Sequence, residues 1–125
     1  MPHFGVSTIC FGPEADAREV LDFVVQHGFH GYELSSYHFW PERLRTGEME
    51  RMRAIVKAHG LRVAIHARHR GVHFGAHDPA LRQRFVEELQ ATVRFVAELG
   101  GDVVVAHVGE IAPTPGAAEP PGSEL

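Results

Sequence analysis

The sequence predicts a parallel α/β fold in which helices and strands alternate along the chain. Three segments share one pattern: a helical stretch, a glycine, a short apolar run and a polar residue. They read QHGFHGYE, AHGLRVAIH and ELGGDVVVAH, and they end at Glu33, His66 and His107. Their spacing of roughly 30 to 40 residues suits one helix and one strand per unit, and strands joined in this way run parallel.

Two strand–helix units are predicted in the first half of the chain. Residues 3–8 (HFGVST) form a short strand candidate, and 14–27 reads as a helix that ends before Gly28. The apolar stripe of this helix consists of Val20, Leu21, Val24 and Val25. A second strand is expected at about 30–34 and a second helix at about 47–59. The apolar face of the second helix carries Met49, Met52, Ile55 and Val56.

The second half repeats this pattern. A third strand is expected at about 61–66, followed by a polar loop. Asp78 and Pro79 are a strong helix start, with Asp as the N-cap and Pro in the first turn, and this helix runs to about Leu99. Its apolar residues at helical spacing are Leu81, Phe85, Leu89, Val93 and Val96. A fourth strand is expected at about 102–107.

Composition bounds the domain organisation and the environment. The 125 residues fit one domain, assigned to residues 1–111, and the Pro- and Gly-rich segment 112–125 is predicted to form a disordered tail. The formal net charge of −4 gives no general attraction to nucleic acid or to anionic membranes. No apolar run is long enough for a membrane span, and a single cysteine without an export signal predicts a cytoplasmic protein.

Two architectures fit this order of elements. One is an open doubly wound sheet, and the other is part of a (β/α)8 barrel, which normally needs about 250 residues. The first strand is followed by GPEADARE, which is neither a dinucleotide-binding glycine motif nor a phosphate-binding loop.

Glu33, His66 and His107 are the candidate site. The C-terminal ends of parallel strands lie at the same edge of a sheet, and neighbouring strands are about 4.8 Å apart. The three side chains are therefore expected to converge. A carboxylate and two imidazoles suit a divalent metal or a proton-transfer site. Glu33 could ligate the metal, hold a substrate hydroxyl or orient His66.

The residues around these positions resemble a known family. The stretches FGVSTICFG, GFHGYEL and VAIHARHRGVHFGAHDPALRQRFVEELQATVRFVAELGGDVVVAHVG, with their spacing, resemble the xylose isomerase-like TIM barrels over about residues 4–109. This superfamily joins sugar phosphate isomerases and epimerases with apurinic (AP) endonucleases of the endonuclease IV type. The resemblance implies the N-terminal half of a TIM (β/α)8 barrel, because four of the eight strands are predicted here.

The resemblance also implies a metal-dependent activity. His66 and His107 match two histidines that bind zinc in the endonuclease IV branch, and Glu33 matches an acidic residue of the isomerase branch, where it would be catalytic. The implied cofactor is a divalent ion (zinc, manganese, magnesium or cobalt). The implied function is a sugar or sugar-phosphate isomerase or epimerase, as a truncated chain. Two alternatives stay open: a zinc phosphodiesterase acting on abasic DNA, which the acidic charge disfavours, and a half-barrel without catalysis.

Substrate contacts are expected from the loops after the second and third strands, which would line the mouth of a barrel. The candidates are Trp40, His69 and Arg70, and the planar guanidinium of Arg70 suits a phosphate or carboxylate. Four parallel strands cannot close into a barrel, so two copies could form an eight-stranded homodimer.

Overall fold

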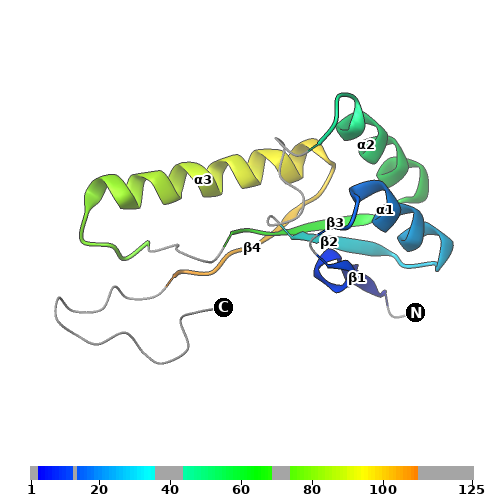
Figure 1. The fold of residues 1–125 in the computed structure, drawn as a ribbon, viewed down its shortest axis with the longest axis horizontal. Coiled ribbons are helices and arrows are strands. Elements are labelled where there is room, and N and C mark those ends of the chain that lie inside the picture. Colours follow the sequence, from blue (N-terminus) through cyan, green and yellow to red (C-terminus); the bar gives the residue numbers. More distant parts are fainter. Residues whose placement is uncertain (1–2, 13, 36–43, 69–73, 110–125) are drawn as a thin grey trace.

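In the computed structural model, residues 3–12, 14–35, 44–68 and 74–109 are described. They form four parallel strands that alternate with three α-helices, as the sequence predicts (Figure 1). The strands are β1 (Gly5–Ser7), β2 (Gly31–Ser35), β3 (Arg62–His66) and β4 (Val103–Val105). The helices are α1 (Ala17–Gln26), α2 (Glu48–His59) and α3 (Pro79–Glu98), and a 3-10 turn, η1 (Thr8–Phe11), follows β1. None of the described helices could cross a membrane, being too short or too polar.

The order of the strands separates the two predicted architectures. The strands lie side by side in chain order, β1-β2-β3-β4, and every neighbouring pair is parallel. The helices α1, α2 and α3 all cover the same face of the sheet (Figure 1). A doubly wound sheet reverses its strand order and carries helices on both faces. The described residues therefore form a segment of barrel wall, with the helices outside.

The helices begin and end where local chemistry dictates. Asp16 caps α1 by accepting a hydrogen bond from the backbone N–H of Arg18, so the helix starts slightly later than the pattern predicts. Asp78 caps α3 in the same way, with Pro79 in the first turn. Helix α2 ends at Gly60, whose φ of 59° is left-handed and favours glycine.

The hydrophobic core fills the space between the helices and one face of the sheet. Its strand residues are Tyr32, Leu34, Val63 and Ile65, and its helix residues include Leu21, Val24, Met52 and Phe95. The Tyr32 hydroxyl is buried without a hydrogen-bond partner among the described residues. Burial disfavours the phenolate and raises the pKa of Tyr32.

Helix α3 differs from the sequence prediction in the face that it buries. Val93, assigned to the apolar stripe, is 48% exposed, whereas Thr92 is buried and donates its hydroxyl to the Glu88 carbonyl. A spacing of four residues rotates by roughly 40° per step in a helix of 3.6 residues per turn, so the predicted stripe drifts away from the core. Gly101 then lets the chain turn closely into β4, because a Cβ there would lie 2.6 Å from the Val63 carbonyl oxygen.

Candidate functional site

A row of polar side chains crosses the face of the sheet that the helices leave open. It starts at Ser7, the last residue of β1, and continues through Glu33 of β2 and His66 of β3 to His107, just beyond β4. Successive side chains of a strand point to opposite faces, so paired residues of parallel neighbours share a face. Ser7 pairs with Glu33 across β1 and β2. The Ala67 N–H donates to the Val105 carbonyl at 2.9 Å, so the chain segments that carry His66 and His107 still lie side by side.

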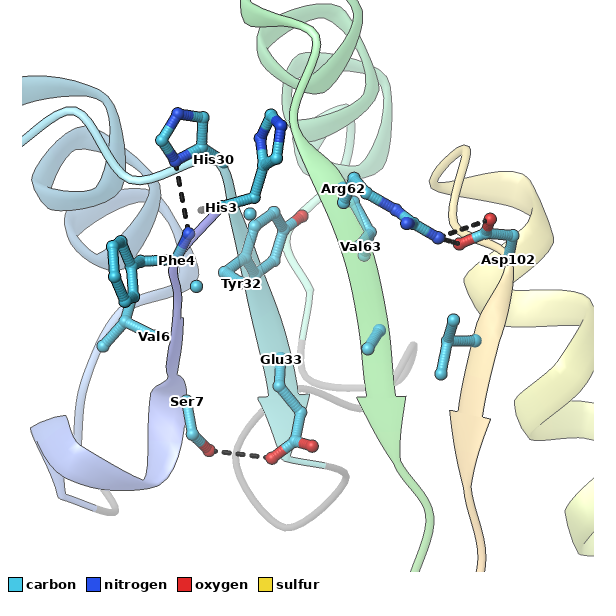
Figure 2. Close-up of a pocket in the computed structure, with 14 residues that line it drawn as sticks. His3, Phe4, Val6, Ser7, His30, Tyr32, Glu33, Arg62, Val63 and Asp102 are labelled. Carbon is cyan, nitrogen blue, oxygen red and sulfur yellow. Dashed lines mark hydrogen bonds and ion pairs between the residues drawn. The ribbon is translucent and has the colours of Figure 1, made fainter. Parts of the chain in front are cut away.

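The four side chains are in contact in this order. The Ser7 hydroxyl donates a hydrogen bond of 3.0 Å to Oε1 of Glu33 (Figure 2). The same carboxylate oxygen lies 3.7 Å from Nδ1 of His66. On the other side of the ring, Nε2 of His66 lies 2.9 Å from Nε2 of His107, and the two imidazoles are nearly parallel at 15°. The predicted convergence of Glu33, His66 and His107 is therefore seen in the geometry.

The order of these contacts bears on the role of Glu33. The carboxylate faces Nδ1 of His66, whereas His107 faces Nε2 of the same ring. One imidazole binds a metal through one nitrogen, and a partner on the other nitrogen fixes its tautomer and orientation. This arrangement suits an orienting partner of His66, which is one of the three roles that the sequence leaves open for Glu33. The distance of 3.7 Å exceeds that of a direct N–H···O hydrogen bond, so the two groups form an ion pair only when the imidazole is protonated.

The position of Glu33 differs from the prediction that it ends its strand. It is the third of five residues in β2, which continues to Ser35. Ser35 pairs with His66, and Glu33 pairs with Ala64. The carboxylate reaches Nδ1 of His66 because its side chain spans this offset along the sheet.

The two histidines fit a metal ion in donor type and in separation. Bonds of 2.0–2.1 Å to one ion place two imidazole nitrogens about 2.9 to 3.4 Å apart for angles between 90° and 110°. The observed 2.9 Å between the Nε2 atoms of His66 and His107 lies at the lower end of this range. The described residues contain no group of three or more metal-binding side chains, whereas a zinc site needs three or four protein ligands.

A broad hollow lies on the open face of the sheet next to this row. Its volume is about 550 Å³, and its lining runs from Ser7 and Glu33 toward the N-terminal ends of the strands (Figure 2). At that far end, Arg62 makes two hydrogen bonds to the carboxylate of Asp102 (Figure 2). The side chain of Glu33, which lines the hollow, is 30% exposed, so a small molecule in the hollow can reach it.

The structure adds Ser7 to the row of candidate side chains and does not describe three of the other candidates. Ser7 was not among the predicted site residues, although it ends the first strand with a polar side chain as His66 ends the third. Trp40, His69 and Arg70 lie outside the described residues, and their role as substrate contacts stays a prediction.

Comparison with known families identifies the family to which the chain belongs. Residues 21–123 match the family described as the xylose isomerase-like TIM barrel. The chain belongs to this family. The predicted fold class and the resemblance drawn from the sequence are thereby confirmed. No curated protein matches the sequence significantly.

Solved structures share the fold at low sequence identity. A D-tagatose 3-epimerase-like protein aligns with a TM-score of 0.65 and 18% identity over 85% of this chain and 38% of its own. The 3-keto-D-glucoside 4-epimerase of E. coli aligns with a TM-score of 0.62 and 22% identity over 86% and 38%. An L-ribulose 3-epimerase aligns with a TM-score of 0.65 and 24% identity over 90% and 36%. The chain thus spans well under half the length of these enzymes.

Proposed function

We propose that this chain carries part of the active site of a metal-dependent isomerase or epimerase acting on a sugar or sugar phosphate. The observation that carries the proposal is the contact between the Nε2 atoms of His66 and His107, with Glu33 on the far side of the His66 ring. The epimerases among the fold neighbours support the sugar class of substrate.

The proposed roles follow from the contacts. His66 and His107 would hold the metal through Nε2, with further ligands from outside the described residues. When bound, the metal would polarise a sugar carbonyl and its adjacent hydroxyl. Glu33 would keep the proton of His66 on Nδ1, so that Nε2 presents its lone pair.

Glu33 has a second oxygen that suits proton transfer. Oε1 has both polar contacts of this carboxylate, with Ser7 and His66, and Oε2 makes none with the described residues. Glu33 lines the open hollow, and its Oε2 would accept a proton from the substrate carbon or hydroxyl. Trp40, His69 and Arg70 would contact the substrate from the loops at the barrel mouth.

The metal site is tested by comparing two double variants. Zn2+, Mn2+ and Co2+ are titrated by calorimetry into the wild type, into His66→Ala/His107→Ala, and into His27→Ala/His59→Ala. The control removes two exposed imidazoles at the ends of α1 and α2. We expect the dissociation constant to rise at least about tenfold in the first variant only, because two ligands are lost together. Equal binding in all three proteins would reject the site.

The reaction class is tested on the same proteins. Ketose epimerisation and cleavage of abasic DNA are assayed side by side with added metal. Metal-dependent epimerisation that is lost in the His66→Ala/His107→Ala variant supports the proposal. Metal-dependent DNA cleavage that is lost in the same variant would replace it by the phosphodiesterase alternative. Metal binding without either activity would leave a half-barrel that binds but does not catalyse.

A further inference from the structure

Ser7 is the first member of the polar row, and the proposed function does not involve it. It ends β1, which among the described strands pairs with β2 only, and its hydroxyl donates to Oε1 of Glu33 at 3.0 Å (Figure 2). The same oxygen faces Nδ1 of His66. One hydroxyl therefore contacts the carboxylate atom that faces the histidine.

A glutamate side chain needs such a contact to hold one orientation. The last torsion of a carboxylate is broad, so either oxygen can turn toward a neighbour unless a hydrogen bond selects one. Glu33 is 30% exposed, and water competes for it. The hydrogen bond from Ser7 favours the orientation in which Oε1 faces His66.

The backbone that carries Ser7 is itself fixed by the next residue. Thr8 is fully buried, and its hydroxyl accepts a hydrogen bond of 2.8 Å from the backbone N–H of Ser35. This contact ties the end of β1 to the end of β2. The Ser7 hydroxyl is thus presented to Glu33 from a rigid position.

We propose that Ser7 is a positioning residue that acts on His66 through Glu33. By holding Oε1 toward Nδ1, it keeps the His66 proton on Nδ1 and leaves the lone pair of Nε2 directed at His107. The consequence for catalysis rests on the proposed function, whereas the effect on the tautomer of His66 does not.

The tautomer is read by long-range 1H–15N correlation spectra of the imidazoles, with His66 assigned by its loss in His66→Ala. In the wild type we expect the Nδ1–H form to dominate. In Ser7→Ala its population should fall by about half, because the carboxylate is no longer held. Ser7→Thr keeps the hydroxyl and should restore the wild-type spectrum. His27 and His59 serve as internal references, because they are exposed and lie at the C-terminal ends of α1 and α2, whereas the row lies toward the C-terminal ends of the strands.

A double-variant cycle tests the route through Glu33. Glu33→Gln removes the charge, and in that background Ser7→Ala should cause no further change in the His66 spectrum. An unchanged His66 tautomer in Ser7→Ala, or an additive change in the double variant, would overturn the proposal. If turnover is found, Ser7→Ala should lower kcat more than it changes KM. Absence of turnover with the expected tautomer shift would count against the proposed function and leave the role of Ser7 intact.

Discussion

The two faces of one sheet differ sharply although they share the same strands. On the helix side, Leu34 and Ile65 are 1% and 0% exposed and belong to the core. On the open side, Val103 and Val105 of β4 are 40% and 36% exposed, and the polar row of Ser7, Glu33, His66 and His107 lies beside them. One face therefore supplies most of the buried apolar area, and the other carries the groups that can do chemistry.

The difference follows from the alternation of side chains along each strand. Glu33 and Leu34 are neighbours in sequence, yet one belongs to the site and the other to the core. The core face is stabilised by apolar burial at roughly 25 cal/mol per Å². The polar row contributes less, because partly exposed hydrogen bonds and ion pairs add about 1 kcal/mol or less each. Stability and chemistry should therefore respond to different substitutions.

The largest expected effect separates these two neighbours on β2. Leu34→Ala should lower the free energy of unfolding by about 3 kcal/mol, since it leaves a cavity in the core. Glu33→Ala should lower it by less than about 1 kcal/mol, because the side chain is partly exposed. Urea unfolding followed by circular dichroism measures both. Equal losses would mean that the open face contributes to stability as strongly as the core.

An intermediate effect is expected on self-association, from a substitution in the edge strand β4. The isolated 13.8 kDa chain should self-associate, because the outer edges of β1 and β4 are unpaired among the described residues and β4 exposes valines. Val103→Lys should weaken this association roughly tenfold, or about 1.4 kcal/mol, by adding a charge that must be desolvated.

Val93→Lys is the matched control for this substitution. It adds the same charge at a similarly exposed valine on α3, away from the edge of the sheet, and should leave the association unchanged. Sedimentation velocity at several concentrations gives the constants for all three proteins. A wild type that stays monomeric at every concentration would contradict the prediction of a homodimer.

The smallest expected effect concerns a polar atom on the core side. Tyr32→Phe removes a buried hydroxyl that has no partner among the described residues, so the free energy of unfolding at neutral pH should rise by about 1 kcal/mol. Burial raises the pKa of Tyr32, so the unfolded chain releases this proton more easily. The stability that depends on it is complete below about pH 10 and is lost as the pH rises further.

The pH dependence provides the measurement for this variant. Urea unfolding of the wild type above about pH 10 should show a loss of stability that is smaller in Tyr32→Phe. Tyr37 is common to both proteins, so its own titration cancels in the difference. A less stable Tyr32→Phe variant would show that the hydroxyl has a favourable partner.

Much of this architecture could be predicted from the sequence, because its signals are local. Asp78 and Gly60 mark helix ends through side-chain capping or backbone freedom, whereas the cap at Asp16 was not predicted and starts α1 later than expected. The strands are apolar runs that end near polar residues. This pattern predicted that Glu33 and His66 lie close together, as the 3.7 Å between their polar atoms shows. The place of Glu33 within β2 and the exposure of Val93 were predicted wrongly, because both depend on the packing of neighbouring elements.

The internal order of the site could not be read from the sequence. Which ring nitrogen of His66 faces Glu33 depends on side-chain torsions and on the stagger between β2 and β3. Ser7 has no chemistry of its own at the end of a short strand, and only the pairing of β1 with β2 places it beside a carboxylate. The roles of Trp40, His69 and Arg70 stay predictions.

The strand order has a consequence for how such a chain is assembled. Each described strand pairs only with the strands directly before and after it in the chain, so a contact such as that between Ser7 and Glu33 spans 26 residues. Loops of this length close at modest entropic cost, so each unit can dock on its predecessor as it leaves the ribosome. The sheet can also lengthen by duplication of one unit at a time, since a strand added beyond β4 disturbs no earlier pairing.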